Sequence, residues 1–209
     1  MVTSRRASVV GSVAGLVLAI GTPTGCSVTP TAPHASVNAS GHDDADIAFA
    51  TAMVPHHEQA IAMARLAADH TQSADIKILA QQIAAEQLPE IVQLQDLLSN
   101  WGQPAAPATS RMSGVAGMSG MDDTTNAGHT VSGPGMMTDQ QMHDLSAASG
   151  AAFDRLFVRM MIKHHGAGIT MAQTELSDGE NADAQQLAEN ISDSQQAQTT
   201  YMIQMLTDK

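Results

Sequence analysis

The sequence of 209 residues contains little cysteine, few aromatic residues and few basic side chains. Its one cysteine, Cys26, has no partner for a disulfide within the chain and excludes cysteine-rich zinc and iron–sulfur sites, so a metal site would use His, Met or carboxylate ligands. Nine Lys and Arg residues stand against 21 Asp and Glu residues, and the net charge of −12 repels phosphate backbones. We therefore expect no nucleic-acid partner.

The apolar share of the sequence is an ordinary 43%, but aromatic residues contribute little to it. One Trp, one Tyr and three Phe cannot fill a core of this size, whereas Ala, Leu, Ile and an unusual 14 Met can. Unbranched and adaptable side chains of this kind pack between helices. The composition thus predicts an all-α protein.

The first 26 residues have the order of a secretory signal: two arginines and a short apolar run in residues 5–20, then small residues before Cys26. The run is too short to span a membrane. The small residues resemble a bacterial lipobox, although Pro23 replaces its usual aliphatic residue. We predict a lipoprotein-type signal peptide over residues 1–25 and lipidation of Cys26. Ordinary cleavage after Gly21, which would leave the cysteine free, is the alternative.

Residues 26–42 are rich in Thr, Pro, Ser and Ala and predict a flexible tether. The chain is therefore expected to be exported, and either anchored to the cell membrane by lipid or located in the periplasmic or other extracytoplasmic space. In both cases the rest of the chain would work outside the cytoplasm.

An internal repeat organises the remaining sequence, because a shift of 108 residues aligns two long segments without a gap. Within each copy, apolar residues and one histidine recur in steps of four and three, which marks one face of a helix. The same spacing continues in the residues that follow, so each copy is expected to contain a second helix. The aligned residues are Asp46, Phe49, Met53, His56, His57, Ile61, Met63, Ala64, Asp75, Leu79, Ala80, Ile83, Gln87 and Leu98 with Asp154, Phe157, Met161, His164, His165, Ile169, Met171, Ala172, Asp183, Leu187, Ala188, Ile191, Gln195 and Leu206.

The repeat predicts a four-helix bundle made of two αα-hairpins with one long connection. Ser73 and Asn181 are expected to begin the second helix of each hairpin, and Gly102 to end one. Thr138 and Gln141 form a capping box that opens a short additional helix. The hairpins are predicted over residues 43–102 and 138–209, with helices near 43–70, 74–100, 151–176 and 182–207, and a Gly/Ser/Met-rich linker over 103–137.

The doubled pattern D-x-x-F-x-x-x-M-x-x-H-H, followed by A-I-A-M-A or G-I-T-M-A and then by a helix with Q-x-x-E-I, resembles the DUF305 family (domain of unknown function). The resemblance implies a ferritin-like four-helix bundle, and it implies copper binding as known for some exported members. The second copy departs from the pattern, because Ser194 and Gln198 stand where the first has Glu86 and Glu90. A role that needs a carboxylate from both halves is therefore not expected.

The repeated histidines and methionines are the candidate metal ligands. Imidazole and thioether groups on one helical stripe could converge inside the bundle, and such borderline and soft donors suit copper, Cu(I) in particular. Adjacent residues on a helix differ by about 100° in direction, so one histidine of each pair could face inward while the other faces a groove or solvent. The predicted ligands are His56, His57, His164, His165, Met53, Met63, Met161 and Met171.

Two other interpretations of these residues stay open. The methionines could be plain core, with each histidine hydrogen-bonded to Asp46, Asp154, Gln87 or Gln195, in a non-catalytic envelope protein that binds an unidentified protein through a bundle groove. Alternatively, metal capture could lie in the linker, at Met112, Met118 and Met121, although a Gly/Ser-rich linker needs no function beyond reach.

A ferritin-like architecture also suggests a di-metal carboxylate oxidoreductase, which requires Glu-x-x-His on two helices. No Glu in this chain has a His three residues later, and no Gly-x-Ser-x-Gly elbow occurs. The weak di-metal alternative therefore ranks last. The sequence favours a metal-binding protein that sequesters or transfers copper and is not an enzyme.

Overall fold

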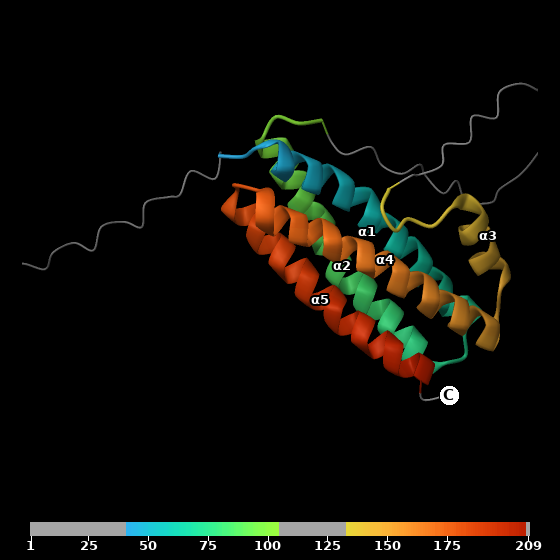
Figure 1. The fold of residues 1–209 in the computed structure, drawn as a ribbon. Coiled ribbons are helices and arrows are strands. Elements are labelled where there is room, and N and C mark those ends of the chain that lie inside the picture. Colours follow the sequence, from blue (N-terminus) through green and yellow to red (C-terminus); the bar gives the residue numbers. More distant parts are fainter. Residues whose placement is uncertain (1–40, 105–132, 208–209) are drawn as a thin grey trace, which may run out of the picture. The chain divides into compact units, whose positions relative to one another are not determined.

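The structure is a computed structural model that describes residues 41–104 and 133–207. These residues form helices only, arranged in two long hairpins and one short connecting helix (Figure 1). The expectation of an all-α protein is confirmed. The helices are α1 (Asp44–His70), α2 (Ala74–Asn100), α3 (Asp139–Ala147), α4 (Gly150–Asp178) and α5 (Ala182–Thr207).

Capping residues define where the helices begin. Asp43 and Asp46 form a capping box at the start of α1, and Ser73 accepts a hydrogen bond from the backbone of Ile76 at the start of α2. Thr138 and Gln141 form the expected capping box of α3. The expected caps are therefore confirmed where the structure describes them, and Asn181 caps α5 by accepting from the backbone of Asp183 and Ala184.

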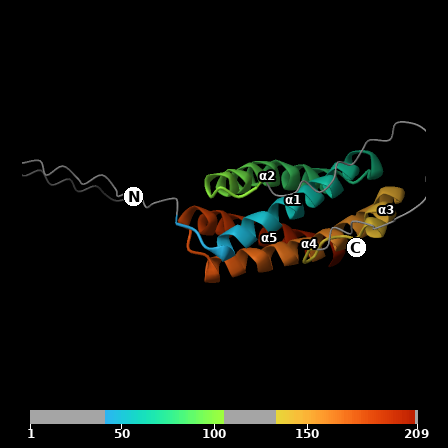
Figure 2. The same ribbon diagram turned by 90° about the horizontal axis from the view of Figure 1, so that it is seen from above.

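Each hairpin packs along its whole length, α1 against α2 and α4 against α5, and the hairpins meet chiefly through α1 and α4 (Figure 2). Helices α2 and α5 also touch, and α3 packs on α1 and α4. This is the expected four-helix bundle of two αα-hairpins. Because α1 and α4 each contact the other hairpin as well as their own partner, both helices bury two faces.

The core consists of two apolar clusters. The first joins the C-terminal half of α1 to the N-terminal halves of α2 and α4 and includes Met63, Met161 and Phe157. The second joins the N-terminal half of α1 to the C-terminal half of α2 and the N-terminal half of α5, and it includes Met53. Between them, at the middle of the four helices, lies a layer of buried polar residues. This layer contains the four histidines of the repeated pairs.

Residues 133–137, which we call the strap, differ from the expected linker because they pack on the bundle. The side chain of Gln59 on α1 donates to the carbonyl oxygen of Met137 (2.9 Å) and accepts from its backbone N–H (2.7 Å). Met136 and Met137 are buried. The last five residues of the predicted linker therefore pack on the bundle through these two hydrogen bonds and two buried side chains.

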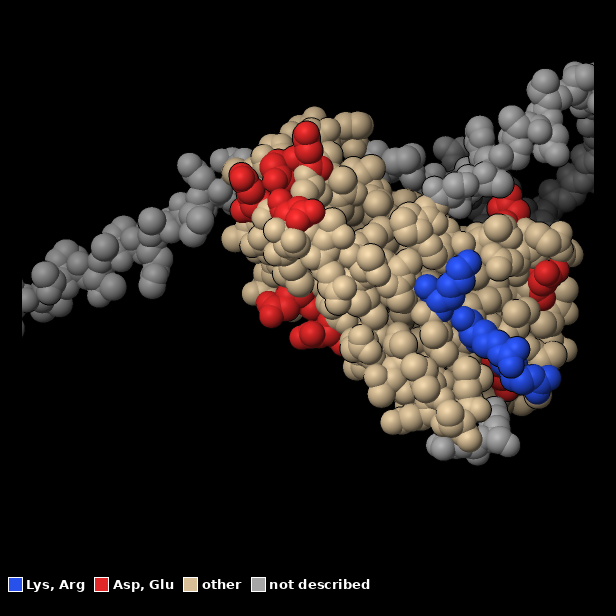
Figure 3. Space-filling model, viewed as in Figure 1, with Lys and Arg blue, Asp and Glu red and all other residues tan. Residues whose placement is uncertain are grey.

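The surface carries more acidic than basic side chains, and one face shows a row of basic residues on α4 (Figure 3). Arg155, Arg159 and Lys163 are exposed at intervals of four residues, which places them on one side of the helix. None of the helices in residues 41–104 and 133–207 combines the length and hydrophobicity that a membrane crossing needs. The predicted signal peptide and Cys26 lie outside the described residues.

Candidate metal centre

The four repeated histidines lie together at the middle of the bundle. The rings of His56 on α1 and His164 on α4 stack with centroids 3.7 Å apart and planes 28° from parallel. His57 lies 6.3 Å from His56, and His165 lies 6.4 Å from His164. All four side chains are at most 1% exposed. The centre therefore has two inner rings from different repeats, each flanked by its neighbour in sequence.

The two flanking histidines make the same hydrogen bond to the second helix of their own hairpin. His57 Nε2 lies 2.8 Å from Glu90 Oε2, and His165 Nε2 lies 2.6 Å from Gln198 Oε1. Both acceptors stand 33 residues after their histidine. The repeats thus use an oxygen at equivalent positions, once from a carboxylate and once from an amide.

A further hydrogen bond joins the two hairpins next to the histidines. Gln198 Nε2 donates to Glu86 Oε2 at 2.6 Å, so its amide oxygen is directed at His165. Burial, and next the negative charge of Glu90, raise the pKa of Glu86. Glu86 therefore connects α2 to α5 at the level of the histidine layer.

These bonds fix which nitrogen of each flanking ring is the donor. Nε2 of His57 donates to a carboxylate and Nε2 of His165 donates to an amide oxygen, so in the neutral form of each ring the lone pair would be on Nδ1. Histidines that ligate a metal are held in the same way, by donation of the other N–H to a carboxylate or carbonyl oxygen. Glu90 and Gln198 thus orient His57 and His165 as Nδ1 donors.

Six nitrogens of the cluster are buried and have no hydrogen-bond partner in the described part of the chain. They are both nitrogens of His56, both nitrogens of His164, and Nδ1 of His57 and His165. Each buried polar atom without a partner costs about 1–3 kcal/mol, and native proteins contain few of them. A bound metal ion would supply the missing interaction.

Burial lowers the pKa of three of the four histidines and favours their neutral form. Burial first, and then the neighbouring histidines, lower the pKa of His56 to about 3. For the same reasons the pKa of His164 lies well below its ordinary value. Burial lowers the pKa of His165 to about 4, against the opposing effect of its bond to Gln198. Neutral imidazole is the form that binds metals, so these rings need release no proton at neutral pH.

The donor chemistry fits a borderline or soft ion, but ligation would require the rings to move. In the described residues, no three His, Cys, Asp or Glu side chains converge on one point as they would around a bound ion. The inner rings are stacked rather than turned toward a shared centre. The structure therefore brings the four histidines together without arranging them in a coordination sphere.

The predicted methionine ligands lie on both sides of the histidine layer. Met53, Met63 and Met161 are fully buried in the apolar clusters, whereas Met171 is partly buried against the second cluster. Met171 also lines a cavity beside His56. Met53, Met63 and Met161 thus have the surroundings of ordinary core residues. Met171 differs from them because it borders a cavity.

Two expectations about the histidines need correction. The idea that one histidine of each pair faces solvent is wrong, because all four side chains are at most 1% exposed, although His56 lines a cavity. The expected hydrogen-bond partners Asp46, Asp154, Gln87 and Gln195 are also wrong. Asp46 instead accepts from the backbone of Glu180 and Asn181, and the side-chain amides of Gln87 and Gln195 are buried without a partner.

Sequence reasoning missed the acceptors Glu90 and Gln198 and the strap. The signal for the acceptors was present, since both are polar residues at the same distance after a repeated histidine. The linker residues Met112, Met118 and Met121 lie outside the described residues, so their predicted role in metal capture stays a prediction.

A buried carboxyl pair, Asp46 and Glu175, lies apart from the histidines. Burial first, then a hydrogen bond to the Asp46 side chain and the negative charges of Asp46 and Asp43, raise the pKa of Glu175 to about 8. Burial opposes ionisation of Asp46 as well, but hydrogen bonds, including those from the backbone of Asp43, Asn181 and Glu180, lower its pKa overall. Glu175 therefore holds a proton at neutral pH beside the Asp46 carboxylate.

We expect Glu175→Gln to remove a pH dependence of stability. The folded chain keeps a proton on Glu175 between the unfolded pKa of 4.5 and the folded value of about 8, so the stability of the parent falls as pH rises through that window. Glutamine mimics the protonated acid. Urea unfolding should show a variant as stable as the parent at pH 4.5 and more stable at pH 9. Parallel stability curves for the two proteins would contradict the assignment.

Comparison with known proteins supports the fold and its family. The DUF305 family, a domain of unknown function, matches residues 46–206. A DUF305 fragment from Deinococcus radiodurans has a similar structure, with a TM-score of 0.63 and 23% identity over 80% of this chain and 98% of that one. A DUF305 protein of Streptomyces coelicolor inferred to be secreted has a TM-score of 0.64 and 25% identity, over 78% of this chain and 93% of that one.

A third similar structure is CopM in its Cu(I)-bound form, with a TM-score of 0.59 and 28% identity over 78% of this chain and 96% of that one. CopM was also solved with Cu(II) and with Ag. A search of curated proteins found no match. The family match covers both hairpins and the histidine pairs of each, and this chain therefore belongs to the DUF305 family.

Proposed function

We propose that this chain is an exported protein that binds copper for sequestration or transfer, and that it is not an enzyme. One observation carries the proposal: six buried imidazole nitrogens from two repeats lie together without hydrogen-bond partners. The similarity to CopM, solved with Cu(I), Cu(II) and Ag, supports metal binding. The similarity to a protein inferred to be secreted supports export.

In this proposal the histidines form the centre and the methionines adjust its preference for the metal. His57 and His165 bind through Nδ1, held by Glu90 and Gln198, and the inner rings of His56 and His164 unstack to direct one nitrogen each to the ion. Met53, Met63, Met161 and Met171 lie next to this layer and supply thioether sulfur, which favours Cu(I) over harder ions. The nitrogen lone pairs of the buried rings would coordinate the bound copper ion, which would supply the interaction that these nitrogens lack.

A binding role agrees better with this geometry than turnover does. The carboxylates near the histidines, Glu86 and Glu90, both come from α2, whereas the second repeat supplies Ser194 and Gln198. A di-metal carboxylate centre needs carboxylates from both halves. We therefore assign no catalytic residue.

The test is titration of the full chain with Cu(I), Cu(II) and Zn(II) in competition with chelators of known affinity. We expect Cu(I) to bind most tightly. Deletion of residues 105–132 separates the centre from the linker: retained binding supports the histidine layer, and loss of binding would move the site to Met112, Met118 and Met121. Absence of copper binding by the full chain would end the proposal.

The predicted membrane anchor has its own test. Cys26→Ser removes the thiol that a lipid would modify, so we expect the variant to leave the membrane fraction and appear in the soluble extracytoplasmic fraction. Fractionation and immunoblotting of cells that express parent and variant would measure this. Ser27→Ala, beside the cysteine, is the matched control and should fractionate as the parent does. Identical membrane fractions for the Cys26→Ser variant and the parent would count against lipidation and favour cleavage after Gly21.

A further inference from the structure

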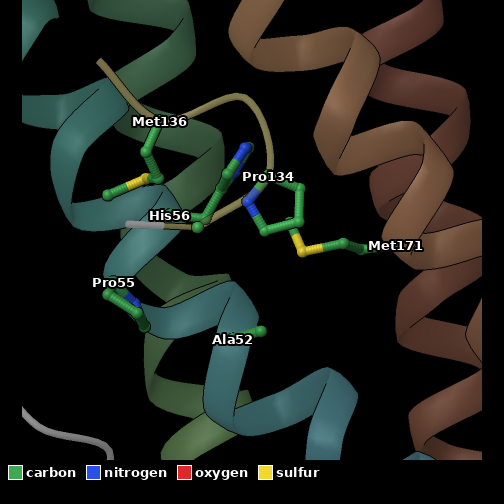
Figure 4. A pocket seen from close by; sticks show the side chains of 7 residues that line it. Ala52, Pro55, His56, Pro134, Met136 and Met171 are labelled. Atoms are coloured by element: carbon green, nitrogen blue, oxygen red, sulfur yellow. The ribbon is translucent and has the colours of Figure 1, made fainter. Parts of the chain in front are cut away.

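A cavity of about 230 Å³ lies beside the histidine layer, with walls from α1, the strap and α4 (Figure 4). Three of its lining side chains carry donor atoms: His56 from α1, Met136 from the strap and Met171 from α4. The other lining residues are Ala, Pro or Gly and carry no side-chain donor. Two thioethers and one imidazole therefore border the same space.

The strap is held firmly over this cavity. The two hydrogen bonds from Gln59 fix the backbone of Met137, directly after Met136. On the other side, Gly135 has φ +71°, and a Cβ built on it would lie 2.2 Å from the Cβ of Ala167 on α4. Only glycine permits both the backbone conformation and this close approach. Contacts with α1 and with α4 thus fix the backbone on both sides of Met136.

The cavity connects the surface to the histidine layer. Gly133 and Pro134 on the strap are exposed, whereas His56 at the inner wall is 1% exposed. His56 is also half of the stack with His164, and neither of its nitrogens has a hydrogen-bond partner. One ring therefore belongs to both the cavity wall and the buried centre.

The repeat shows that this arrangement exists on one side of the bundle. The residue equivalent to Met171 in the first repeat is Met63, which is fully buried in an apolar cluster. Met171 is partly exposed and borders the cavity. Of these two equivalent residues, only Met171 lines the cavity to which the strap contributes Met136.

We propose that His56, Met136 and Met171 form a second metal site, specific for a soft monovalent ion such as Cu(I) or Ag(I), through which the ion reaches the buried histidines. This inference rests on the proposed copper-binding function. Thioether and imidazole donors select soft ions, and none of the side chains that line the cavity carries an oxygen. Metal would bind at the cavity first and then pass to the histidine layer by way of the shared ring of His56.

The experiment uses Ag(I), which does not change oxidation state, and the full chain with labelled methionine methyl groups and histidine ring nitrogens. Nuclear magnetic resonance would follow both sets of signals, with Met136→Leu and Met171→Leu used to assign the two methyl groups. We expect these methyl signals to shift at the first additions of Ag(I), before those of His57 and His165. The double variant should bind fewer ions and load the histidine layer at least about tenfold more slowly.

Met142→Leu is the matched control, because Met142 lies on α3, is partly buried in the first apolar cluster and does not line the cavity. It should leave Ag(I) stoichiometry and loading rate unchanged. Shifts of the histidine signals without any shift at Met136 and Met171 would overturn this inference while the proposed function stands. Shifts at both methionines without any at His57, His164 and His165 would support the second site and remove the buried centre. Absence of any Ag(I) or Cu(I) binding would overturn both.

Discussion

Simultaneous replacement of His56 and His164 by Gln should weaken Cu(I) binding by at least about a hundredfold, because it removes both inner rings from the centre. Loss of residues that only orient a ligand costs 10- to 100-fold in metal affinity, and loss of two ligands should exceed this. Glutamine remains polar and similar in length, so the helices should persist. Competition titration with a Cu(I) chelator would measure the affinity, and circular dichroism would confirm the helical fold.

His143→Gln is the matched control for this variant. His143 is an exposed histidine on α3, and its replacement changes the same chemistry away from the bundle interior. It should bind Cu(I) as the parent does. If the double variant also bound Cu(I) with parental affinity while its stability changed, the inner histidines would be structural and the copper centre would lie elsewhere.

The helices could be predicted closely because local signals define them. Apolar residues at steps of three and four marked each helix, and Ser73, Thr138 and Asn181 marked where helices begin. Predicted and observed limits of the four long helices differ by at most two residues. The repeat then implied the bundle, since two hairpins of equal length can cover each other's apolar faces.

The centre could be predicted only in part, because helical periodicity describes one buried face at a time. In this bundle α1 packs on both α2 and α4, so His56 and His57 are both buried although they point in different directions. The alignment of Glu90 with Gln198 looked like a departure from symmetry. Its meaning becomes clear in the structure, where both side chains accept a hydrogen bond from a histidine. What the repeat retains at this position is an acceptor oxygen.

The strap could not be predicted for a different reason. Its Gly- and Pro-containing sequence has no period, and its contact with Gln59 joins residues 78 positions apart. These hydrogen bonds use the side chain of Gln59 but only the backbone of Met137, so they place no constraint on the identity of Met137. Only the glycine at position 135, where φ is positive and α4 is close, carries a local trace of this contact.

Replacement of His56 and His164 by Leu should stabilise the metal-free protein, in contrast to most substitutions in a core. The change removes four buried nitrogens without partners, each of which costs about 1–3 kcal/mol, and it loses a ring stack worth about 0.5–1.5 kcal/mol. Leucine fills a similar volume. We expect the free energy of unfolding to rise by about 2 kcal/mol or more and Tm by roughly 4–8 °C, measured by urea and thermal unfolding without metal.

The same variant should also resist acid better. In the parent, His56 is neutral when folded, with a pKa of about 3, but takes up a proton on unfolding below pH 6.5. Parental stability therefore falls as pH drops below 6.5, by up to about 1.4 kcal/mol per pH unit for each such histidine. The leucine variant should lose this dependence for two rings, and copper should no longer raise its Tm. A large loss of stability in the metal-free variant would instead show that the inner histidines hold the fold together. A gain in stability together with the loss of copper binding would mean that the bundle gives up stability to keep these rings available for metal.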